Sequence, residues 1–320
     1  MNIETPTPVD PAFREDVLTG FRMARRAIPA RWFYDRRGSE LFEQITALPE
    51  YYPTRVETEL LARHSVDVAR IVGPGRAVVE FGSGSSAKTP HVLEAVQPAA
   101  YVPIDISGDF LRESAAALAS DFPKLSILPV EADFMHPIVP PAEITGMQKL
   151  GFFPGSTIGN MVARTSVNLL RAMVETLGIG SMLLIGMDRV KDVDTLTRAY
   201  DDAAGITAAF NLNLLHRINR ELNADIPIDA FRHRAIWNDD YSRIEMHLEA
   251  QREVAFSIED ERFAMRAGET IHTENSHKYG PREARLLLRA GAWTPIAEWT
   301  DAEDRFALIL CEAQPPGTAP

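Results

Sequence analysis

The chain contains 320 residues, more than one average domain needs, and its 45% hydrophobic and 24% charged residues are typical of a folded globular protein. Its formal net charge of −12 repels phosphate backbones and anionic lipid, which argues against nucleic acid or a membrane as a partner. The single cysteine, Cys311, excludes an internal disulfide, no signal-peptide pattern opens the chain, and no apolar stretch reaches the roughly 20 residues that span a bilayer, so we expect a cytoplasmic protein.

From the N-terminus to about residue 55 the pattern is helical and rich in aromatic side chains. Short apolar runs and helical segments then alternate. The runs predicted as strands are 77–81, 101–105, 125–130, 150–153 and 182–187, and the segments predicted as helices are 88–96, 108–118 and 165–177. This alternation indicates βαβ units, a parallel sheet and ligands at the carboxyl ends of its strands.

The pattern from about residue 190 to 278 is helical at first and becomes that of an alternating strand at 243–249. Near the end of the chain, 293–299 and 305–312 predict an antiparallel hairpin at the edge of the sheet, which resembles the last strands of class I methyltransferases. We therefore predict an α/β fold, a class I Rossmann-like sheet with a second, α+β domain. The sheet domain, 56–189 with 279–320, is predicted to bind the cofactor, and the domain formed by 1–55 and 190–278 the substrate.

Three successive strand ends carry residues suited to a nucleotide cofactor. Gly82 and Gly84 follow the first strand, where glycine lets the backbone turn tightly and approach a ligand. Asp105 ends the second strand, where a carboxylate can accept from two ribose hydroxyls. Asp133 and Phe134 follow the third, where the acid can accept from an adenine amino group and the ring can pack on the base. Each feature alone is typical of a turn or a helix cap, but all three together favour a nucleotide.

The acid at Asp133 and the terminal hairpin favour S-adenosylmethionine over NAD, although the glycine loop itself does not distinguish them. Lys88 and Thr89 follow the loop without the spacing of a phosphate-binding Walker motif. The residues predicted to bind the cofactor are Gly82, Gly84, Lys88, Asp105, Asp133 and Phe134.

Characteristic motifs extend along nearly the whole chain. They are 31–35 (RWFYD), 48–55 (LPEYYPTR), 81–84 (FGSG), 155–160 (GSTIGN), 200–205 (YDDAAG), 218–222 (INREL), 242–248 (SRIEMHL) and 273–278 (TENSHK). Together they resemble the motifs of the histidine Nα-methyltransferases of ergothioneine biosynthesis. The resemblance implies methylation of the α-amino nitrogen of L-histidine with S-adenosylmethionine as the donor, to give trimethylhistidine (hercynine).

The resemblance also implies which residues bind the two ends of the substrate. Asn160 and Tyr200 resemble the pair that holds the carboxylate, and an amide N–H and a phenol O–H both donate to an anion. Glu274 and Ser276 resemble the pair that binds the imidazole, where a carboxylate accepts from one ring N–H and a hydroxyl satisfies the other nitrogen. Met246 resembles the residue that lines the ring pocket.

Four further residues complete the predicted substrate site by the same resemblance. Tyr34 and Tyr51 resemble the tyrosines beside the amine and the ring, Gly155 would lie near the amino group, and Phe42 would line the site. Tyr34 is also the predicted catalytic residue, because it is best placed to orient the neutral amine for attack. No strong general base is evident, since an exposed amine can lose its proton to water.

Other interpretations stand beside this one. Without the resemblance, Met246 would be assigned to the core and Glu274 to the solvated surface. The rival functions are methylation of another aromatic amino acid, binding of the cofactor or an amino acid without catalysis, and a nicotinamide oxidoreductase. A metal site at His272, Glu274 and His277 is disfavoured by its spacing, so we predict no metal. Asn275, where the family is usually apolar, and His277, where it is usually small, depart from the family pattern. We expect a monomer that acts on a small molecule.

Overall fold

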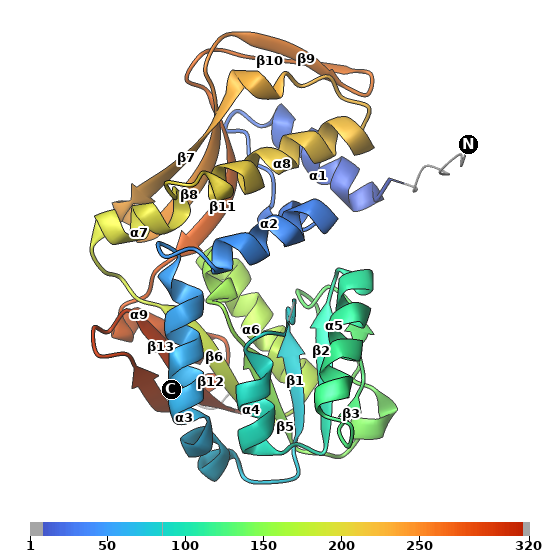
Figure 1. Cartoon of the computed structure of the whole chain (residues 1–320), viewed down its shortest axis with the longest axis vertical. Coiled ribbons are helices and arrows are strands. Elements are labelled where there is room, and N and C mark those ends of the chain that lie inside the picture. The colour runs from blue at the N-terminus through green and yellow to red at the C-terminus, as the bar shows by residue number, and fades with distance from the viewer. Residues whose placement is uncertain (1–8, 85, 316–320) are drawn as a thin grey trace. The chain divides into compact units, whose positions relative to one another are not determined.

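A computed structural model of the chain describes residues 9–84 and 86–315, and the chain divides into two compact units (Figure 1). One unit comprises residues 1–51 and 192–275, and the other comprises 52–191 and 276–320. The sequence placed the corresponding boundaries after residues 55, 189 and 278. Which part binds cofactor and which binds substrate stays a prediction.

The unit formed by 52–191 and 276–320 contains an eight-stranded sheet. In the order of the sheet its strands are β12 (Trp293–Thr300), β13 (Phe306–Ala313), β6 (Met182–Asp188), β5 (Lys149–Phe153), β1 (Ala77–Phe81), β2 (Ala100–Asp105) and β3 (Ser126–Ile127), and β4 (Val130–Glu131) also pairs with β2. The pairings from β6 through β3 and β4 are parallel, whereas β13 is antiparallel to both β6 and β12. This order, with the antiparallel hairpin inserted at one edge, confirms the predicted class I methyltransferase fold.

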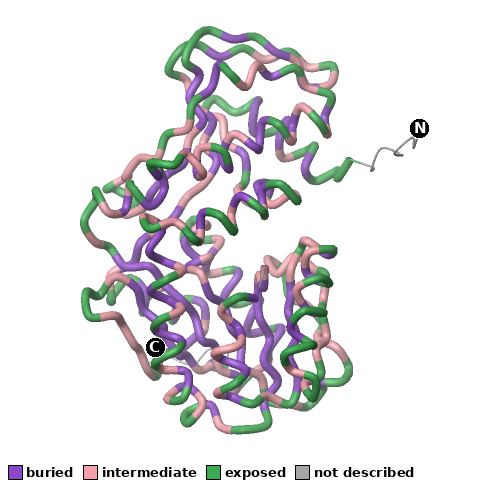
Figure 2. Tube along the Cα trace, in the orientation of Figure 1, coloured by how far each residue is buried: buried purple, intermediate pink, exposed green. Residues whose placement is uncertain are grey.

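Helices cover both faces of this sheet (Figure 1). They are α3 (Tyr52–Val72), α4 (Thr89–Val96), α5 (Gly108–Asp121), α6 (Ala163–Leu177) and α9 (Pro281–Ala290), with short 3-10 turns η2 (Ala142–Ile144) and η3 (Thr157–Asn160). Alternate residues of each strand face the same side, so Val79 and Phe81 join side chains of α6 and α9 in one core cluster. All of β1 is buried, as expected of a strand covered on both faces (Figure 2).

The other unit combines helices with two small sheets. Its helices are α1 (Pro11–Arg22), α2 (Arg36–Thr46), α7 (Val193–Tyr200) and α8 (Ile206–Glu221), with 3-10 turns η1 (Ala30–Phe33), η4 (Ile228–Ala230) and η5 (Asp239–Tyr241). One sheet has the order β11 (Thr270–His277), β8 (Arg243–Ala250), β7 (Phe231–Asn238), and β9 (Val254–Ile258) pairs with β10 (Glu261–Met265) as a hairpin. The last two residues of β11 belong to the unit with the large sheet.

The third predicted strand differs from the structure. The segment 125–130 does not form one strand, because Pro129 separates β3 from β4. Proline has no backbone N–H to donate to a sheet and therefore interrupts the pairing. The contact with β2 survives at Leu128, whose N–H donates to the carbonyl oxygen of Tyr101 at 2.8 Å.

Two further features of the structure concern membrane-spanning helices and the environment of Cys311. No helix within residues 9–84 and 86–315 is long and apolar enough to cross a membrane. Cys311 lies in β13 and is buried, and burial raises the pKa of its thiol well above the usual range. An un-ionised, inaccessible thiol is a poor nucleophile.

Candidate active site

Loops at one edge of the eight-stranded sheet bring most of the predicted cofactor residues together. The loop after β1 contains Gly82 and Gly84, β2 ends at Asp105, and Asp133 follows β4. Because β1, β2 and β4 are parallel, their carboxyl ends meet at the same edge of the sheet.

Backbone conformation explains why the loop after β1 needs glycine. Gly82 and Gly84 have φ angles of +71° and +50°, a region that other residues rarely adopt. A Cβ atom on Gly82 would lie 3.2 Å from Cε1 of Phe134, whereas in the described part of the chain no atom other than those of the chain neighbours lies within 4 Å of the Cβ position of Gly84. This space beside Gly84 is compatible with the predicted cofactor loop.

Asp105 holds this loop and the following turn in place. The N–H of Gly84 donates to its Oδ2 at 3.0 Å, and the N–H of Ser107 donates to its Oδ1 at 2.9 Å. Each carboxylate oxygen can accept about two hydrogen bonds, so both retain acceptor capacity for a ribose diol.

Asp133 and Phe134, predicted to contact the adenine, lie in the turn after β4. Asp133 Oδ1 accepts from the N–H of Met135 at 2.9 Å, which fixes the turn after β4. The ring of Phe134 lies 5.8 Å from that of Phe153, edge to face, and contacts the position of Gly82. Its ring is therefore held by packing.

Glu57 is a residue that the sequence interpretation missed. Its side chain lies in α3, is fully buried, accepts from the N–H of Gly155 at 3.0 and 2.9 Å, and pairs with the ammonium of Lys88. Lys88, predicted to contact the cofactor, and Gly155, predicted beside the amine, are thus joined through one carboxylate. The signal was present in the sequence, because Glu57 falls in the apolar stripe of a helix with Val56 and Leu60.

A buried charged network surrounds Asp188, at the end of β6. Its carboxylate accepts from the hydroxyl of Tyr52 at 2.7 and 2.9 Å and pairs with the ammonium groups of Lys191 at 2.5 Å and Lys278 at 2.7 Å. Burial opposes ionisation of Asp188, but the two ammonium groups outweigh it and lower its pKa. Burial also lowers the pKa of Lys191 to about 8.

This network reaches Ser276, one of the two residues predicted to bind the imidazole. Lys278 Nζ donates to Ser276 Oγ at 2.8 Å, so the serine oxygen is positioned by a buried ammonium. The neighbouring His277 places Nδ1 2.8 Å from the carbonyl oxygen of Gly159. Asn160, the next residue, closes η3 and is half-buried.

In the other unit the predicted aromatic residues form one cluster. Ring centroids lie 5.6 Å apart for Tyr34 and Phe42, 6.3 Å for Phe42 and Tyr51, and 6.0 Å for Tyr51 and Tyr200, each pair edge to face. Phe210 of α8, which the sequence did not single out, contacts both Tyr34 at 5.8 Å and Phe42 at 6.0 Å. Such edge-to-face packing fixes the orientation of each ring relative to its neighbour.

Hydrogen bonds to Asp35 anchor the helix that carries Phe42. Asp35 caps α2 by accepting from the N–H of Gly38 at 2.7 Å. The same carboxylate accepts from Asn213 at 2.8 Å and from Arg220 at 2.6 Å, both on α8. The start of α2 is therefore attached to the helix that supplies Phe210.

Met246 and Glu274 lie on neighbouring strands, β8 and β11. Met246 is buried, and its carbonyl oxygen accepts from the hydroxyl of Thr273 at 3.0 Å. Glu274 is half-buried, and its carbonyl oxygen lies 3.0 Å from Nε2 of His272.

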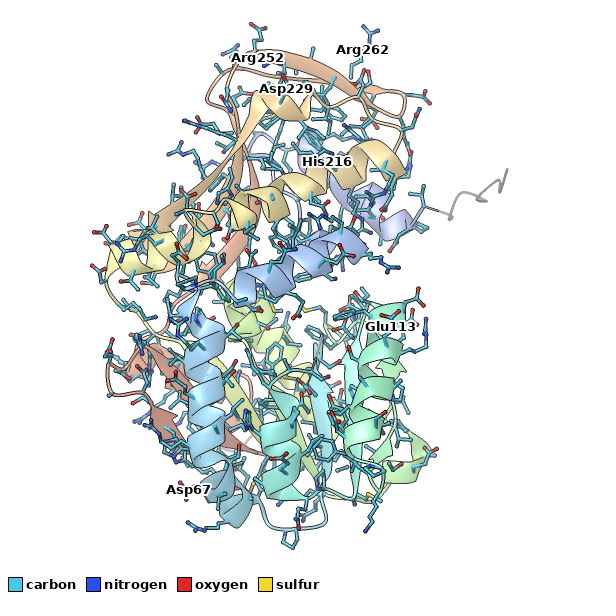
Figure 3. The ribbon with its side chains drawn as sticks, viewed as in Figure 1. Asp67, Glu113, His216, Asp229, Arg252 and Arg262 are labelled. Carbon is cyan, nitrogen blue, oxygen red and sulfur yellow. The ribbon has the colours of Figure 1, made fainter. Side chains whose placement is uncertain are left out.

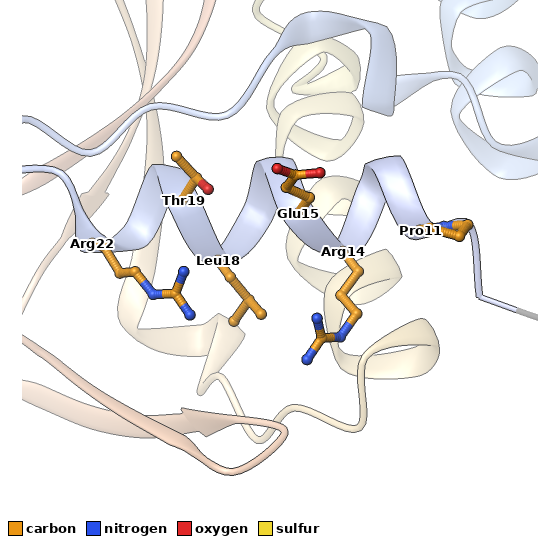
Figure 4. Close-up of a pocket in the computed structure, with 6 residues that line it drawn as sticks. All are labelled: Pro11, Arg14, Glu15, Leu18, Thr19 and Arg22. Atoms are coloured by element: carbon orange, nitrogen blue, oxygen red, sulfur yellow. The ribbon is translucent and has the colours of Figure 1, made fainter.

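A surface pocket on α1 contains none of the predicted residues. It is lined by Pro11, Arg14, Glu15, Leu18, Thr19 and Arg22 (Figure 4). Arg14 and Arg22 pair with Glu259 and Glu261 of the β9–β10 hairpin, so these cations already have carboxylate partners. The pocket plays no part in the predicted site.

Comparison with known proteins extends over both units. The family described as "Histidine-specific methyltransferase, SAM-dependent" matches residues 13–313. Histidine N-alpha-methyltransferase of Mycolicibacterium smegmatis is 41% identical over 305 residues, covering 93% of this chain and 94% of that protein. The protein of the same name from Mycobacterium tuberculosis is 41% identical over 306 residues, with 93% and 94% covered. Ergothioneine biosynthesis protein 1 of Neurospora crassa is 28% identical over 297 residues, covering 90% of this chain and 33% of that protein.

Proposed function

Because this chain belongs to the family of histidine-specific, S-adenosylmethionine-dependent methyltransferases, we propose that it methylates the α-amino nitrogen of free L-histidine to give trimethylhistidine, a step of ergothioneine biosynthesis. The observation that carries this proposal is the reach of the similarity, which spans residues 13–313 and so includes the segments with Tyr34, Asn160 and Glu274. A nicotinamide cofactor is not supported, since the family uses S-adenosylmethionine.

We assign the cofactor to the loops at the edge of the large sheet. The space beside Gly84 and the remaining acceptor capacity of Asp105 support an assignment to the ribose. Asp133 and Phe134 are assigned to the adenine, and Gly82 to the close approach of the chain. Lys88 is assigned to the cofactor less directly, because its ammonium already pairs with Glu57.

The substrate is assigned to residues at its two ends. Asn160 and Tyr200 would donate to the carboxylate, and Glu274 would accept from an imidazole N–H. Ser276 would hydrogen bond the second ring nitrogen, and the buried ammonium of Lys278 would hold its oxygen in position. Met246, Tyr51, Phe42 and Gly155 would complete the contacts.

The main task of the protein in this reaction is to position the amine against the methyl donor. S-adenosylmethionine supplies an activated methyl group on a sulfonium. Before each transfer the ammonium would give one proton to water. The amine lone pair would then form the new N–C bond as the C–S bond breaks, with S-adenosylhomocysteine as the leaving group. Tyr34 would orient the amine, and the aromatic rings of Tyr34 and Phe42, whose centroids lie 5.6 Å apart edge to face, would suit the cation that forms as methyl groups are added.

We further propose that the chain acts as a cytoplasmic monomer on small molecules. The net charge of −12 supports the absence of nucleic acid and anionic membranes among its partners. Sedimentation of the purified protein would test the monomer, and a mass of two chains would contradict it.

The decisive experiment is incubation with S-adenosylmethionine and an equimolar pool of the free amino acids. Mass spectrometry is expected to show one, two and finally three methyl groups on histidine alone. Methylated tyrosine or tryptophan would assign the chain to a different substrate. Binding of S-adenosylmethionine without any methylated product would indicate a sensor, and the Asp105→Ala variant, run in parallel, gives the background without cofactor binding.

A further inference from the structure

Three potential metal ligands meet on the small sheet formed by β7, β8 and β11. Glu245 and His247 are two residues apart on β8 and so face the same side, and His272 lies on the neighbouring strand β11. The two imidazole rings are stacked, 4.7 Å apart and 19° from parallel. One ligand atom from each residue lies within 4.8 Å of the others. The pairing of two strands thus presents a carboxylate and two imidazoles together.

The hydrogen bonds of Glu245 leave one of its oxygens directed to the histidines. Oε1 accepts from Arg243 at 2.5 and 2.8 Å and from Asn238 at 2.9 Å. Oε2 lies 3.0 Å from Nε2 of His247. Neighbouring ligand atoms of a small divalent ion are about 3 Å apart when each bond is about 2.1 Å long, so this pair already has a suitable separation.

Both histidines have a nitrogen that can supply a lone pair. His272 Nε2 lies 3.0 Å from the carbonyl oxygen of Glu274, which can only accept, so that nitrogen carries the proton and Nδ1 holds the lone pair. This bond to a carbonyl is the outer contact that commonly orients a metal-binding histidine. In the metal-free protein Nε2 of His247 donates to Oε2 of Glu245, so an ion bound at Nε2 requires the proton to move to Nδ1, which is buried and has no hydrogen-bond partner among the described residues.

We propose that Glu245, His247 and His272 form a binding site for one divalent transition-metal ion, with zinc, cobalt or nickel as the chemical class. Imidazole ligands favour these ions over magnesium and calcium. Two histidines and one carboxylate leave a coordination position for water or another ligand. The guanidinium of Arg243 on Glu245 weakens the attraction, so binding is reversible and weaker than at structural zinc sites. Because His272 also contacts the carbonyl of Glu274, the ion restrains that part of β11.

The test uses untagged, full-length protein that has been treated with chelator and kept free of histidine, since free histidine binds these ions itself. Zinc is titrated by calorimetry and cobalt by visible absorption. We expect one ion per chain and the absorption bands of imidazole-bound cobalt. His247→Gln and His272→Gln should each lower the affinity at least tenfold and remove those bands. Glutamine at 272 retains an N–H donor for the carbonyl of Glu274.

The matched control is His216→Gln, an exposed histidine on α8 of the same unit (Figure 3). It should bind zinc as the unchanged protein does. Thermal melting checks each variant for folding, and added zinc should raise the melting temperature of the unchanged protein and of the control only. If one histidine variant fails to fold, the other and Glu245→Gln carry the comparison. Unchanged affinity in the folded variants, or no bound ion at millimolar zinc, would overturn the proposal.

Discussion

At the scale of single residues, the choice of substrate rests on Glu274. We predict that Glu274→Ala weakens histidine binding by about 1.5–3 kcal/mol, the range for a lost hydrogen bond to a charged group, and leaves cofactor binding unchanged. Calorimetric titration with S-adenosylhomocysteine and then with histidine measures both affinities. Glu253→Ala, at an exposed glutamate in the turn after β8, is the control. Equal histidine affinity in all three proteins would remove Glu274 from the site.

A second residue-scale prediction concerns the buried acid of β1. Glu80 Oε2 accepts from the hydroxyls of Thr89 at 2.7 Å and Tyr101 at 2.5 Å, but burial outweighs these bonds and raises the pKa of Glu80 to about 7. A carboxyl group whose pKa is raised by folding favours the folded state fully below its unfolded pKa, 4.5, and that contribution is lost as the pH rises through 7. The upper limit of the loss is on the order of 3 kcal/mol.

The variant that isolates this effect is Glu80→Gln, which does not titrate. Melting temperatures of the two proteins are measured from pH 4.5 to 8. We expect the unchanged protein to lose stability relative to Glu80→Gln most steeply between the unfolded pKa of 4.5 and the folded pKa of about 7, and the difference to level off above that pH. Parallel curves would mean that Glu80 titrates alike in the folded and unfolded chain.

At the scale of elements, the turn from β1 to α4 requires glycine at position 82 for two reasons, a positive φ angle and a close contact with Phe134. Gly82→Ala should lower stability by about 1–3 kcal/mol because of its φ of +71°, and should also weaken cofactor binding because its Cβ would press on Phe134. Gly73→Ala is the matched control, since Gly73 has a φ of +75° and, apart from its chain neighbours, no atom of the described residues lies within 4 Å of its Cβ position. We expect both variants to melt earlier and only Gly82→Ala to bind S-adenosylhomocysteine more weakly. Similar cofactor affinities would assign the need for glycine to strain alone.

The strands also show which parts of the fold the sequence patterns could predict. Apolar runs identified β1, β2, β5 and β6, because strands buried on both faces are continuously hydrophobic. The prediction of a single strand over 125–130 was wrong, because Pro129 interrupts the backbone pairing between β3 and β4. The local pattern also predicted that the glycine loop and Asp105 lie close together, because a parallel sheet brings the carboxyl ends of its strands to one edge.

At the scale of the whole molecule, the sequence could not predict which side chains far apart in the chain contact one another. Glu57 joins Lys88 to Gly155, and Phe210 joins Tyr34 to Phe42, across separations that no local pattern encodes. The substrate residues could be named only through family resemblance. The cluster of Glu245, His247 and His272 depends on how β8 and β11 pair, so the sequence trio of His272, Glu274 and His277 did not reveal it.

Hydrogen exchange can distinguish protection by the cofactor from protection by histidine, because the proposed cofactor loops and Glu274 lie in different units. Residues 52–191 and 276–320 contain the cofactor loops together with Gly155, Asn160 and Ser276, while 192–275 contains Tyr200 and Glu274. A ligand slows exchange most where it suppresses local opening. S-adenosylhomocysteine should therefore protect peptides that follow β1, β2 and β4, and histidine added afterwards should protect the peptide ending at Glu274.

The aromatic cluster sets a further expectation for the same measurement. Tyr34, Phe42, Tyr51 and Tyr200 are packed before any ligand binds, so their peptides should already exchange slowly in the free protein and gain less protection than the peptide of Glu274. Peptides of the β9–β10 hairpin, which carries no proposed contact, serve as the internal reference. Cofactor protection confined to 192–275 would contradict the assignment of the cofactor to the loops of the large sheet. If histidine protects the Glu274→Ala variant as strongly as the unchanged chain, the imidazole binds elsewhere.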